Sequence, residues 1–261
     1  MIREKKYLIL YLLGGLALLF IVAPIFNLFF STELNTVFET SRDKQVQSSV
    51  FLTLWVSLAA TLFCAIFAIP LAYLIARNSF RFKNLLLGII NIPIVIPHSA
   101  GGIAILGLVS RDTLIGKMAD KIGLSFIDNP LGIAVAMAYV SIPFLIFLSI
   151  DGFSKIPEKI EQAALNLGAS KIRVFFTVAL PIAKKSVFSG LILMFSRGIS
   201  EFGAVIMLAY FPTITPILIY DRFTAFGLSN ARPIAAIFIV ICMIIFLFFF
   251  LITNKKRNKT C

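Results

Sequence analysis

The sequence has 261 residues, of which 59% are hydrophobic, and its mean hydropathy is +0.98. This composition excludes a soluble domain with one core and predicts a protein that crosses a membrane several times. The formal net charge of +12 would suit nucleic acid only if a soluble fold carried a basic patch, and none is visible, so nucleic acid is not an expected partner.

Six apolar runs are long enough to cross the hydrocarbon of a bilayer, which takes about 20 helical residues. They cover residues 7–30, 48–76, 85–109, 131–150, 187–210 and 233–253. The first run is too long for a signal peptide and lacks a small-residue cleavage site, so we expect it to be retained. The sequence therefore predicts an all-α integral membrane protein with six transmembrane helices in one polytopic domain, residues 1–261.

A polar segment, residues 31–47, separates the first and second runs, and we expect it to be an external loop. Prolines then fall inside the second and third runs. Pro70 lies in the second run, and Pro93 and Pro97 lie in the third, directly before His98 and Ser99. We expect the hydrogen-bond ladder of the third run to be interrupted near mid-membrane. Such breaks are tolerated where they pack against protein or line a cavity, so this stretch is either a structural kink or part of a transport path. His98 is correspondingly either an internally bonded side chain or an anion ligand.

Two features follow before the chain returns to the cytoplasm. Residues 112–123 predict a short external helix with an apolar face that lies on the bilayer surface. In the fourth run Gly132 and Ala136 have the spacing that lets two helices approach closely, and Pro143 should loosen its end.

A polar insert, residues 156–181, separates the fourth and fifth runs. Pro157 and Gly168 suit the first turn and the terminator of a helix, and Ser170 suits the cap of a second helix that we expect to break at Leu180–Pro181. One face of the first helix is apolar: Ile160, Ala163, Ala164 and Leu167. From periodicity alone this helix–Gly–helix elbow could be an amphipathic loop on the membrane surface or a docking element.

The elbow resembles the EAA loop of ABC importer permeases, whose pattern is Glu-Ala-Ala, three residues, Gly, nine residues and Ile-x-Leu-Pro. Gln162 stands in the Glu position, with Glu161 just before it, and Val178 stands in the Ile position. The resemblance implies a type I ABC importer permease fold with a core at residues 48–253 and a cytoplasmic coupling loop at residues 154–181. The coupling residues that it implies are Glu161, Ala163, Ala164, Leu167, Gly168, Leu180 and Pro181.

The fifth run carries two intramembrane charges, Arg197 and Glu201, which we expect to share one helical face and to pair. The pair either fixes helix packing or belongs to the path or gate of an anion. The surrounding stretch, residues 195–223, resembles the molybdate/tungstate branch of these permeases, in which Arg, a small residue and Glu-Phe-Gly-Ala recur. The four candidate path or gate residues are thus His98, Ser99, Arg197 and Glu201.

The last external loop predicts a helix over residues 216–226, with Thr215 as its N-cap and Gly227 as its terminator. Asp221 and Arg222 should lie free on one side and contact a binding protein. The alternative is a loop that only closes the bundle.

Basic residues are concentrated on one side of the predicted bundle. That side holds Arg3, Lys5, Lys6, Arg77, Arg81, Lys83, Lys155, Lys159, Lys171, Arg173, Lys184, Lys185, Lys255, Lys256, Arg257 and Lys259. Because positive loops stay in the cytoplasm, we predict a multi-pass protein of the cell membrane with both termini cytoplasmic.

Few side chains are suited to catalysis or metal binding. Cys64 and Cys242 lie in apolar runs and Cys261 is a lone thiol, so no disulfide framework is expected, and one histidine cannot form a metal site. A membrane-embedded enzyme is therefore disfavoured, and a secondary transporter would need internal repeats and more intramembrane carboxylates. The sequence also lacks a phosphate-binding loop, so this chain is not expected to hydrolyse ATP or to hold a cofactor.

The family resemblance implies the remaining partners. They are a second copy of the permease, two ATPase subunits that use ATP and Mg²⁺, an external oxyanion-binding protein and the lipid bilayer. The implied substrate is a tetrahedral oxyanion such as molybdate or tungstate, with sulfate or another oxyanion as the alternative.

Overall fold

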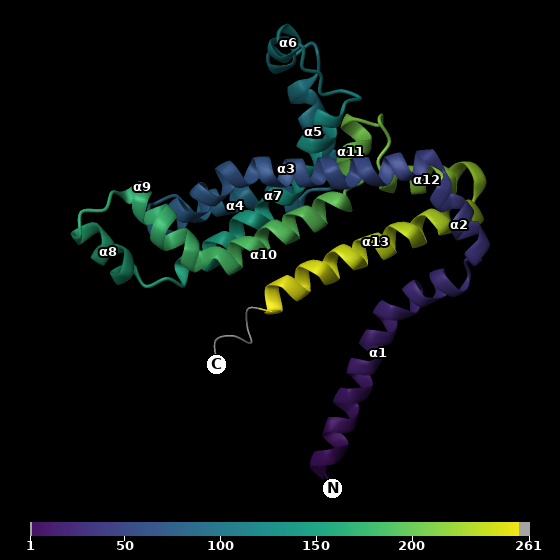
Figure 1. Ribbon diagram of the computed structural model, residues 1–261, viewed down its shortest axis with the longest axis horizontal. Coiled ribbons are helices and arrows are strands. Elements are labelled where there is room, and N and C mark those ends of the chain that lie inside the picture. Colours follow the sequence, from purple (N-terminus) through teal and green to yellow (C-terminus); the bar gives the residue numbers. More distant parts are fainter. Residues whose placement is uncertain (1, 256–261) are drawn as a thin grey trace.

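The computed structural model describes residues 2–255, and every regular element among them is a helix. Lys256, Arg257, Lys259 and Cys261, used in the charge and cysteine arguments, lie outside these residues. Within them, five helices are long and apolar enough to cross a membrane, and a sharply bent pair can supply a sixth crossing. Figure 1 shows the long helices side by side in an elongated bundle.

The N-terminal helices lie at one edge of this bundle. Helix α1 (Ile2–Phe30) stands away from the other helices in Figure 1, and its apolar surface is exposed. The segment after it, which we predicted to be an external loop, contains a short helix, α2 (Leu34–Arg42). Apolar side chains at Leu34, Val37 and Phe38 give this segment helical periodicity. Asp43 then ends α2 and caps the next helix by accepting a hydrogen bond from the Gln45 N–H at 2.8 Å.

Three long helices form the core: α3 (Lys44–Arg77), α7 (Pro130–Ser154) and α10 (Leu180–Ile199). Helix α7 packs against both others. Pro70 lies inside α3 without breaking it. A proline removes one backbone hydrogen bond, and the dense packing of α3 against α7 keeps the rest of the helix in place.

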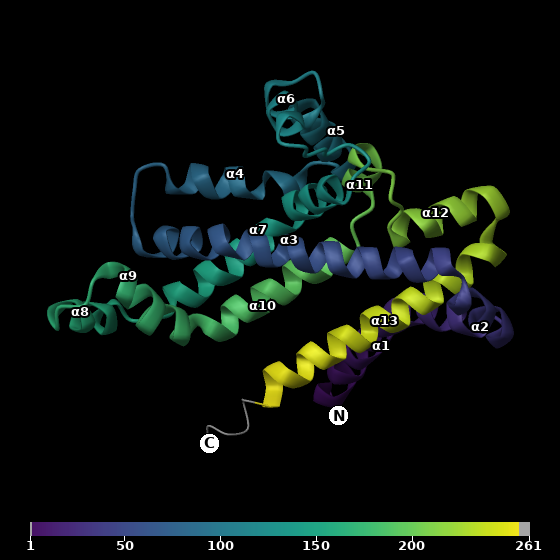
Figure 2. The same cartoon turned by 45° about the horizontal axis from the view of Figure 1, so that its top comes forward.

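The interruption predicted for the third span is confirmed. Helices α4 (Lys83–Val95) and α5 (His98–Val109) meet at an angle of 109°. Ile96 is extended, with ψ 151°, because the ring of Pro97 disfavours helical backbone in the residue before it. Figure 2 shows α4 running along α3 and α5 turning away from it.

The fifth span differs from its prediction at both ends. Helix α10 stops at Ile199, and the short helix α11 (Gly203–Leu208) follows after a break, so residues 187–210 are not one helix. At the other end the helix extends into the elbow. The predicted break at Leu180–Pro181 is wrong, because α9 (Lys171–Val174), the π-helix η1 (Phe175–Ala179) and α10 are continuous from Lys171 to Ile199.

The π turn accounts for this continuity. The Leu180 N–H donates to the Phe175 carbonyl, five residues back instead of four. A wider turn leaves room for the ring of Pro181, which would otherwise collide with the carbonyl four residues before it.

The elbow itself forms as predicted. Helix α8 (Glu158–Asn166) starts after Pro157 and ends before Gly168, whose φ is +88°. The Ala169 N–H donates to the Ala164 carbonyl at 3.1 Å, the hydrogen bond that closes a helix through a left-handed residue. Ser170 accepts a hydrogen bond from the Arg173 N–H and so caps α9.

Three helices complete the other end of the molecule. The helices predicted within residues 112–123 and 216–226 are present as α6 (Leu114–Lys121) and α12 (Thr215–Phe226), and α13 (Leu228–Lys255) is the last span. Gly227 ends α12 with φ +80°, as predicted. Thr215 is not the N-cap, because its hydroxyl is buried and receives a hydrogen bond from Thr53 of α3 at 3.2 Å.

Candidate functional site

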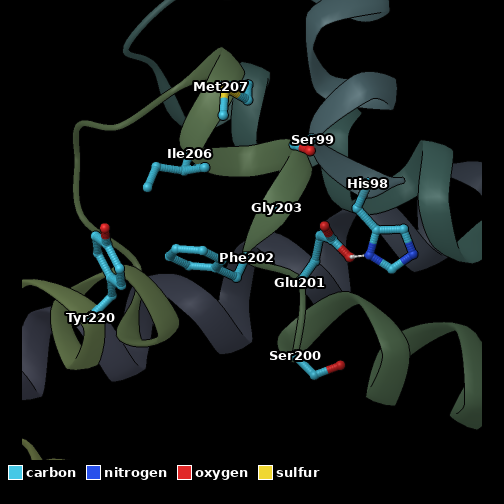
Figure 3. Close-up of a pocket in the computed structure, with 9 residues that line it drawn as sticks. All are labelled: His98, Ser99, Ser200, Glu201, Phe202, Gly203, Ile206, Met207 and Tyr220. Carbon is cyan, nitrogen blue, oxygen red and sulfur yellow. Dashed lines mark ion pairs between the residues drawn. The ribbon is translucent and has the colours of Figure 1, made fainter. Parts of the chain in front are cut away.

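A cavity of about 550 Å³ lies where the two broken spans meet. The start of α5 forms one wall, and the α10–α11 break, α11 and Tyr220 of α12 form the rest (Figure 3). Its lining residues are His98, Ser99, Ser200, Glu201, Phe202, Gly203, Ile206, Met207 and Tyr220. Three of the four predicted path residues thus lie around one space, and the fourth, Arg197, lies beside them.

Glu201 is the fully buried charge of this site. Its Oε1 accepts a hydrogen bond from the Ala204 N–H at 2.9 Å, which fixes the first turn of α11. Its Oε2 lies 3.1 Å from Nη2 of Arg197 and 3.2 Å from Nδ1 of His98. Neither neighbour is aligned for a directed hydrogen bond, so Oε2 is held by charge. The predicted Arg197–Glu201 pair is confirmed, although Glu201 lies beyond the end of α10.

His98 joins the pair from a segment 99 residues away. Its Nδ1 lies 2.8 Å from Nη2 of Arg197 and 3.2 Å from Glu201. Because a guanidinium can only donate, Nδ1 of His98 is the acceptor in its hydrogen bond with Arg197, which requires the tautomer whose proton is on Nε2. The expectation of an internally bonded His98 is confirmed. Figure 3 shows the imidazole facing the carboxylate across the cavity wall.

Two glycines bring the walls of this site together. A methyl group on Gly102 of α5 would lie 2.6 Å from the Ala204 carbonyl oxygen, and one on Gly203 would lie 3.0 Å from Cβ of His98. Helices α5 and α11 therefore pack backbone to backbone. Sequence reasoning missed Tyr220 as a lining residue, because nothing in the local pattern places α12 beside the break, and it missed Ser200, because the break between α10 and α11 was not predicted.

The elbow presents the predicted apolar face to its surroundings. Leu167 is 89% exposed and Ile160 is 45% exposed, Ala163 is exposed and Ala164 is half-buried. Pro181 is exposed and Leu180 is half-buried. Among the described residues, nothing packs over the Leu167 side chain. That these residues contact an ATPase stays a prediction.

Glu161 lies to one side of this surface and faces its own chain. It is only 6% exposed, and its carboxylate accepts hydrogen bonds from Arg77 and Tyr73 at the end of α3. Its structural surroundings therefore differ from those of the other predicted coupling residues, because it contacts its own chain.

The predicted external docking residues are not free, which corrects that expectation. Asp221 accepts a hydrogen bond from the Tyr210 hydroxyl at 2.6 Å. Arg222 lies 3.1 Å from Oδ2 of Asp43 and 3.0 Å from Oε1 of Gln45. Both side chains hold α12 against neighbouring segments because the fold brings residues 43–45 and 210 next to it. The exposed side of α12 consists instead of Tyr220, Phe223 and Phe226.

No group of three or more His, Cys, Asp or Glu side chains within residues 2–255 is placed to hold a metal ion. The arrangement has paired charges next to a cavity and an exposed apolar helix at the far end.

Sequence comparisons place the chain among transport proteins. The family model described as binding-protein-dependent transport system inner membrane component matches residues 68–257. The molybdate/tungstate transport system permease protein of Pyrococcus furiosus is 37% identical over 248 residues, 94% of each chain. The corresponding protein of Methanocaldococcus jannaschii is 40% identical over 204 residues, covering 78% of this chain and 80% of that protein. A probable sulfate transport permease of Chlorokybus atmophyticus is 32% identical over 200 residues, covering 75% of this chain and 70% of that protein.

Solved structures share the fold at low sequence identity. A bacterial ABC transporter that imports alginate gives a TM-score of 0.76 at 18% identity, covering 97% of each chain. The same type of transporter in complex with an alginate-bound periplasmic protein gives a TM-score of 0.74 at 17% identity, covering 99% of this chain and 96% of that one. An inward-facing methionine ABC transporter gives a TM-score of 0.59 at 15% identity, covering 83% of this chain and 96% of that one.

Proposed function

The chain belongs to the family of binding-protein-dependent transport system inner membrane components, and we propose that it is the permease subunit of an ABC importer for molybdate and tungstate. The predicted fold, an all-α type I ABC importer permease, is confirmed. The protein is a multi-pass membrane protein of a binding-protein-dependent transport system.

The substrate assignment rests on the relatives. Those that cover 94% of this chain transport molybdate and tungstate, according to their descriptions, and the sulfate-type relatives match less of the chain at lower identity. Molybdate, tungstate and sulfate are all tetrahedral dianions, so sulfate is the alternative substrate.

In this proposal the energy comes from a separate subunit. The sequence holds no G-x-x-x-x-G-K-[ST] motif, which is the loop that cradles ATP phosphates in such subunits. Two copies of the chain would form the pore, two ATPase subunits would use ATP and Mg²⁺, and an external binding protein would deliver the oxyanion. The N- and C-termini would lie in the cytoplasm.

The exposed face of α8 is the observation that carries the coupling part of the proposal. A helix end with Leu167 89% exposed, and with small alanines beside it, suits insertion into a groove of another protein. The cavity at Glu201 lies at the far end of the continuous α9–η1–α10 segment, so a movement of the elbow reaches it through one helix. We propose that this cavity forms part of the oxyanion path or its gate.

Reconstitution tests the assignment. The permease is placed in liposomes with its ATPase and binding protein, and uptake of molybdate, tungstate and sulfate is measured with and without ATP. We expect ATP-dependent uptake of molybdate and tungstate. Equal uptake of sulfate would favour the alternative substrate, and uptake driven by an ion gradient without ATP would indicate a secondary transporter.

A pair of variants tests the docking face. Leu167→Glu places a charge on the exposed apolar face, where a groove would leave it desolvated, so the ATPase should no longer co-purify. Gln162→Glu is the matched control, since it adds the same charge at an exposed position of the same helix and should leave co-purification unchanged. Co-purification of the ATPase with both variants would show that this face of α8 does not contact the ATPase.

A further inference from the structure

The root of the elbow contains a buried charged cluster that the docking face does not explain. In the described part of the chain, Glu161 and Glu201 are the charged residues that are buried, and Glu161 lies on a helix that otherwise projects from the bundle. A carboxylate is expensive to bury unless its oxygens are matched by donors. The groups that donate to the buried Glu161 carboxylate therefore show what it is held against.

Both oxygens of Glu161 have partners on one helix. Oε1 accepts from Nε of Arg77 at 3.0 Å and from Nη2 of Arg77 at 2.5 Å, and Oε2 accepts from the Tyr73 hydroxyl at 2.7 Å. The Arg77 side chain is itself only 13% exposed. Three charge-assisted hydrogen bonds thus join α8 to the last turn of α3.

An aromatic cluster supports these hydrogen bonds. The Tyr73 ring centroid lies 5.3 Å from that of Phe153 in α7 and 5.0 Å from that of Phe175 in η1. The guanidinium of Arg77 lies 6.0 Å from the centre of the Tyr73 ring. The Tyr73 and Arg77 donors are therefore held in position by contacts that do not involve Glu161, and α3, α7 and η1 all meet at this point.

Helix α3 leads from this cluster to the other end of the molecule. Along its buried side, Ser57 donates to the Phe195 carbonyl of α10 at 3.0 Å, and Thr53 receives a hydrogen bond from the Thr215 N–H of α12 at 2.9 Å. The elbow is thus joined to α10 through the continuous chain and to α3 through the Glu161 carboxylate.

We propose that Glu161, Arg77 and Tyr73 form a clamp that makes α3 follow the coupling helix, so that α3 and α10 move together when the ATPase moves the elbow. This inference rests on the proposed coupling function of α8. Glu161 is then a positioning residue whose role is in transmission, and the exposed face of the same helix remains the contact with the ATPase.

The test compares assembly with coupling in the complete complex in liposomes. Glu161→Gln keeps the shape of the side chain but removes its charge and leaves Arg77 unpaired. We expect the ATPase to co-purify normally, while oxyanion uptake per ATP hydrolysed falls by about tenfold, the effect of losing a charge-assisted hydrogen bond from one conformation. Stimulation of ATP hydrolysis by the loaded binding protein should fall with it.

Two further variants separate transmission from folding. The exchange Glu161→Arg with Arg77→Glu restores opposite charges, so it should recover much of the uptake per ATP that Arg77→Glu alone loses. Asp151→Asn is the matched control, because Asp151 also pairs with a basic residue near the elbow, Lys155, but is 52% exposed. It should leave uptake per ATP unchanged.

The outcomes are distinguishable. If Glu161→Gln loses the ATPase altogether, Glu161 acts in docking or folding and the clamp is wrong, while the coupling function of α8 stands. If Glu161→Gln transports with normal coupling, or the charge exchange recovers nothing, the clamp is wrong as well. If Leu167→Glu keeps the ATPase, the proposed coupling function itself fails.

Discussion

At the scale of single residues, the cluster at the cavity is built around one carboxylate oxygen. Oε2 of Glu201 has Arg197 and His98 within 3.2 Å, and its other oxygen holds the first turn of α11. A dianion that approaches this cavity would be repelled by a bare carboxylate. Arg197 and His98 therefore both hold the break together and mask its negative charge.

The first prediction concerns this masking. Arg197→Ala should lower the stability of the protein by about 2–3 kcal/mol, less than for a fully enclosed pair because 24% of the Arg197 side chain is exposed. Adding Glu201→Gln should recover most of this loss, since the amide oxygen of the new side chain can still accept from the Ala204 N–H and no unpaired charge is left. Thermal unfolding in detergent measures both. Equal stability of the single and double variants would show that an unpaired Glu201 carboxylate carries no cost in this protein.

The second prediction concerns the contact between α5 and α11. Gly102→Ala places a methyl group 2.6 Å from the Ala204 carbonyl oxygen and 2.9 Å from Cβ of Met207, so the helices must separate, at a cost of about 1–3 kcal/mol. Gly107→Ala in the same helix meets nothing within 4 Å and is the control. We expect lower thermal stability and slower uptake for Gly102→Ala alone. Identical behaviour of the two variants would contradict the close approach.

At the scale of helices, periodicity and capping residues predicted most elements. The elbow, its Gly168 terminator, the Ser170 cap and the break at Pro97 all depend on local backbone chemistry, and all are present. Errors arose where tertiary contacts decide. The fifth span ends early because Glu201 turns to the Ala204 amide.

The site was predictable to the same degree. The pairing of Arg197 with Glu201 followed from their spacing, whereas His98 approaches from 99 residues away and no local pattern reports that. The partners of Asp221 and Arg222 were missed for the same reason, because Asp43 and Gln45 are distant in sequence.

The third prediction tests the elbow as an element. Gly168 has φ +88° and open space around it, so Gly168→Ala suffers from backbone strain alone, about 1–2 kcal/mol. Gly168→Asn should be better tolerated, because Asn adopts left-handed backbone more readily. Uptake per ATP hydrolysed should be highest in the unmodified protein, lower in Gly168→Asn and lowest in Gly168→Ala. Gly88→Ala, also in open space but without positive φ, should match the unmodified protein. An Asn variant worse than the Ala variant would argue against this backbone explanation.

At the scale of the whole molecule, the basic residues and the elbow predict one orientation. Leu167 at the elbow should face the cytoplasm, and Ala225 at the end of α12 should face outside. The fourth prediction uses Leu167→Cys and Ala225→Cys in a background without Cys64, Cys242 and Cys261. A membrane-impermeant maleimide added to intact cells should label only Ala225→Cys, and opening the cells should expose Leu167→Cys. The reverse pattern would invert the topology.

The continuity of α9, η1 and α10 also has a mechanical consequence. Its 29 residues make a lever arm of roughly 43 Å, at about 1.5 Å per residue. If the bundle acts as a fulcrum near one end, a tilt of about 5° displaces the other end by roughly 4 Å over that length. That displacement exceeds the 2.8 Å between Nη2 of Arg197 on α10 and Nδ1 of His98 on α5, so a small rotation at the elbow is enough to break this contact between the two helices.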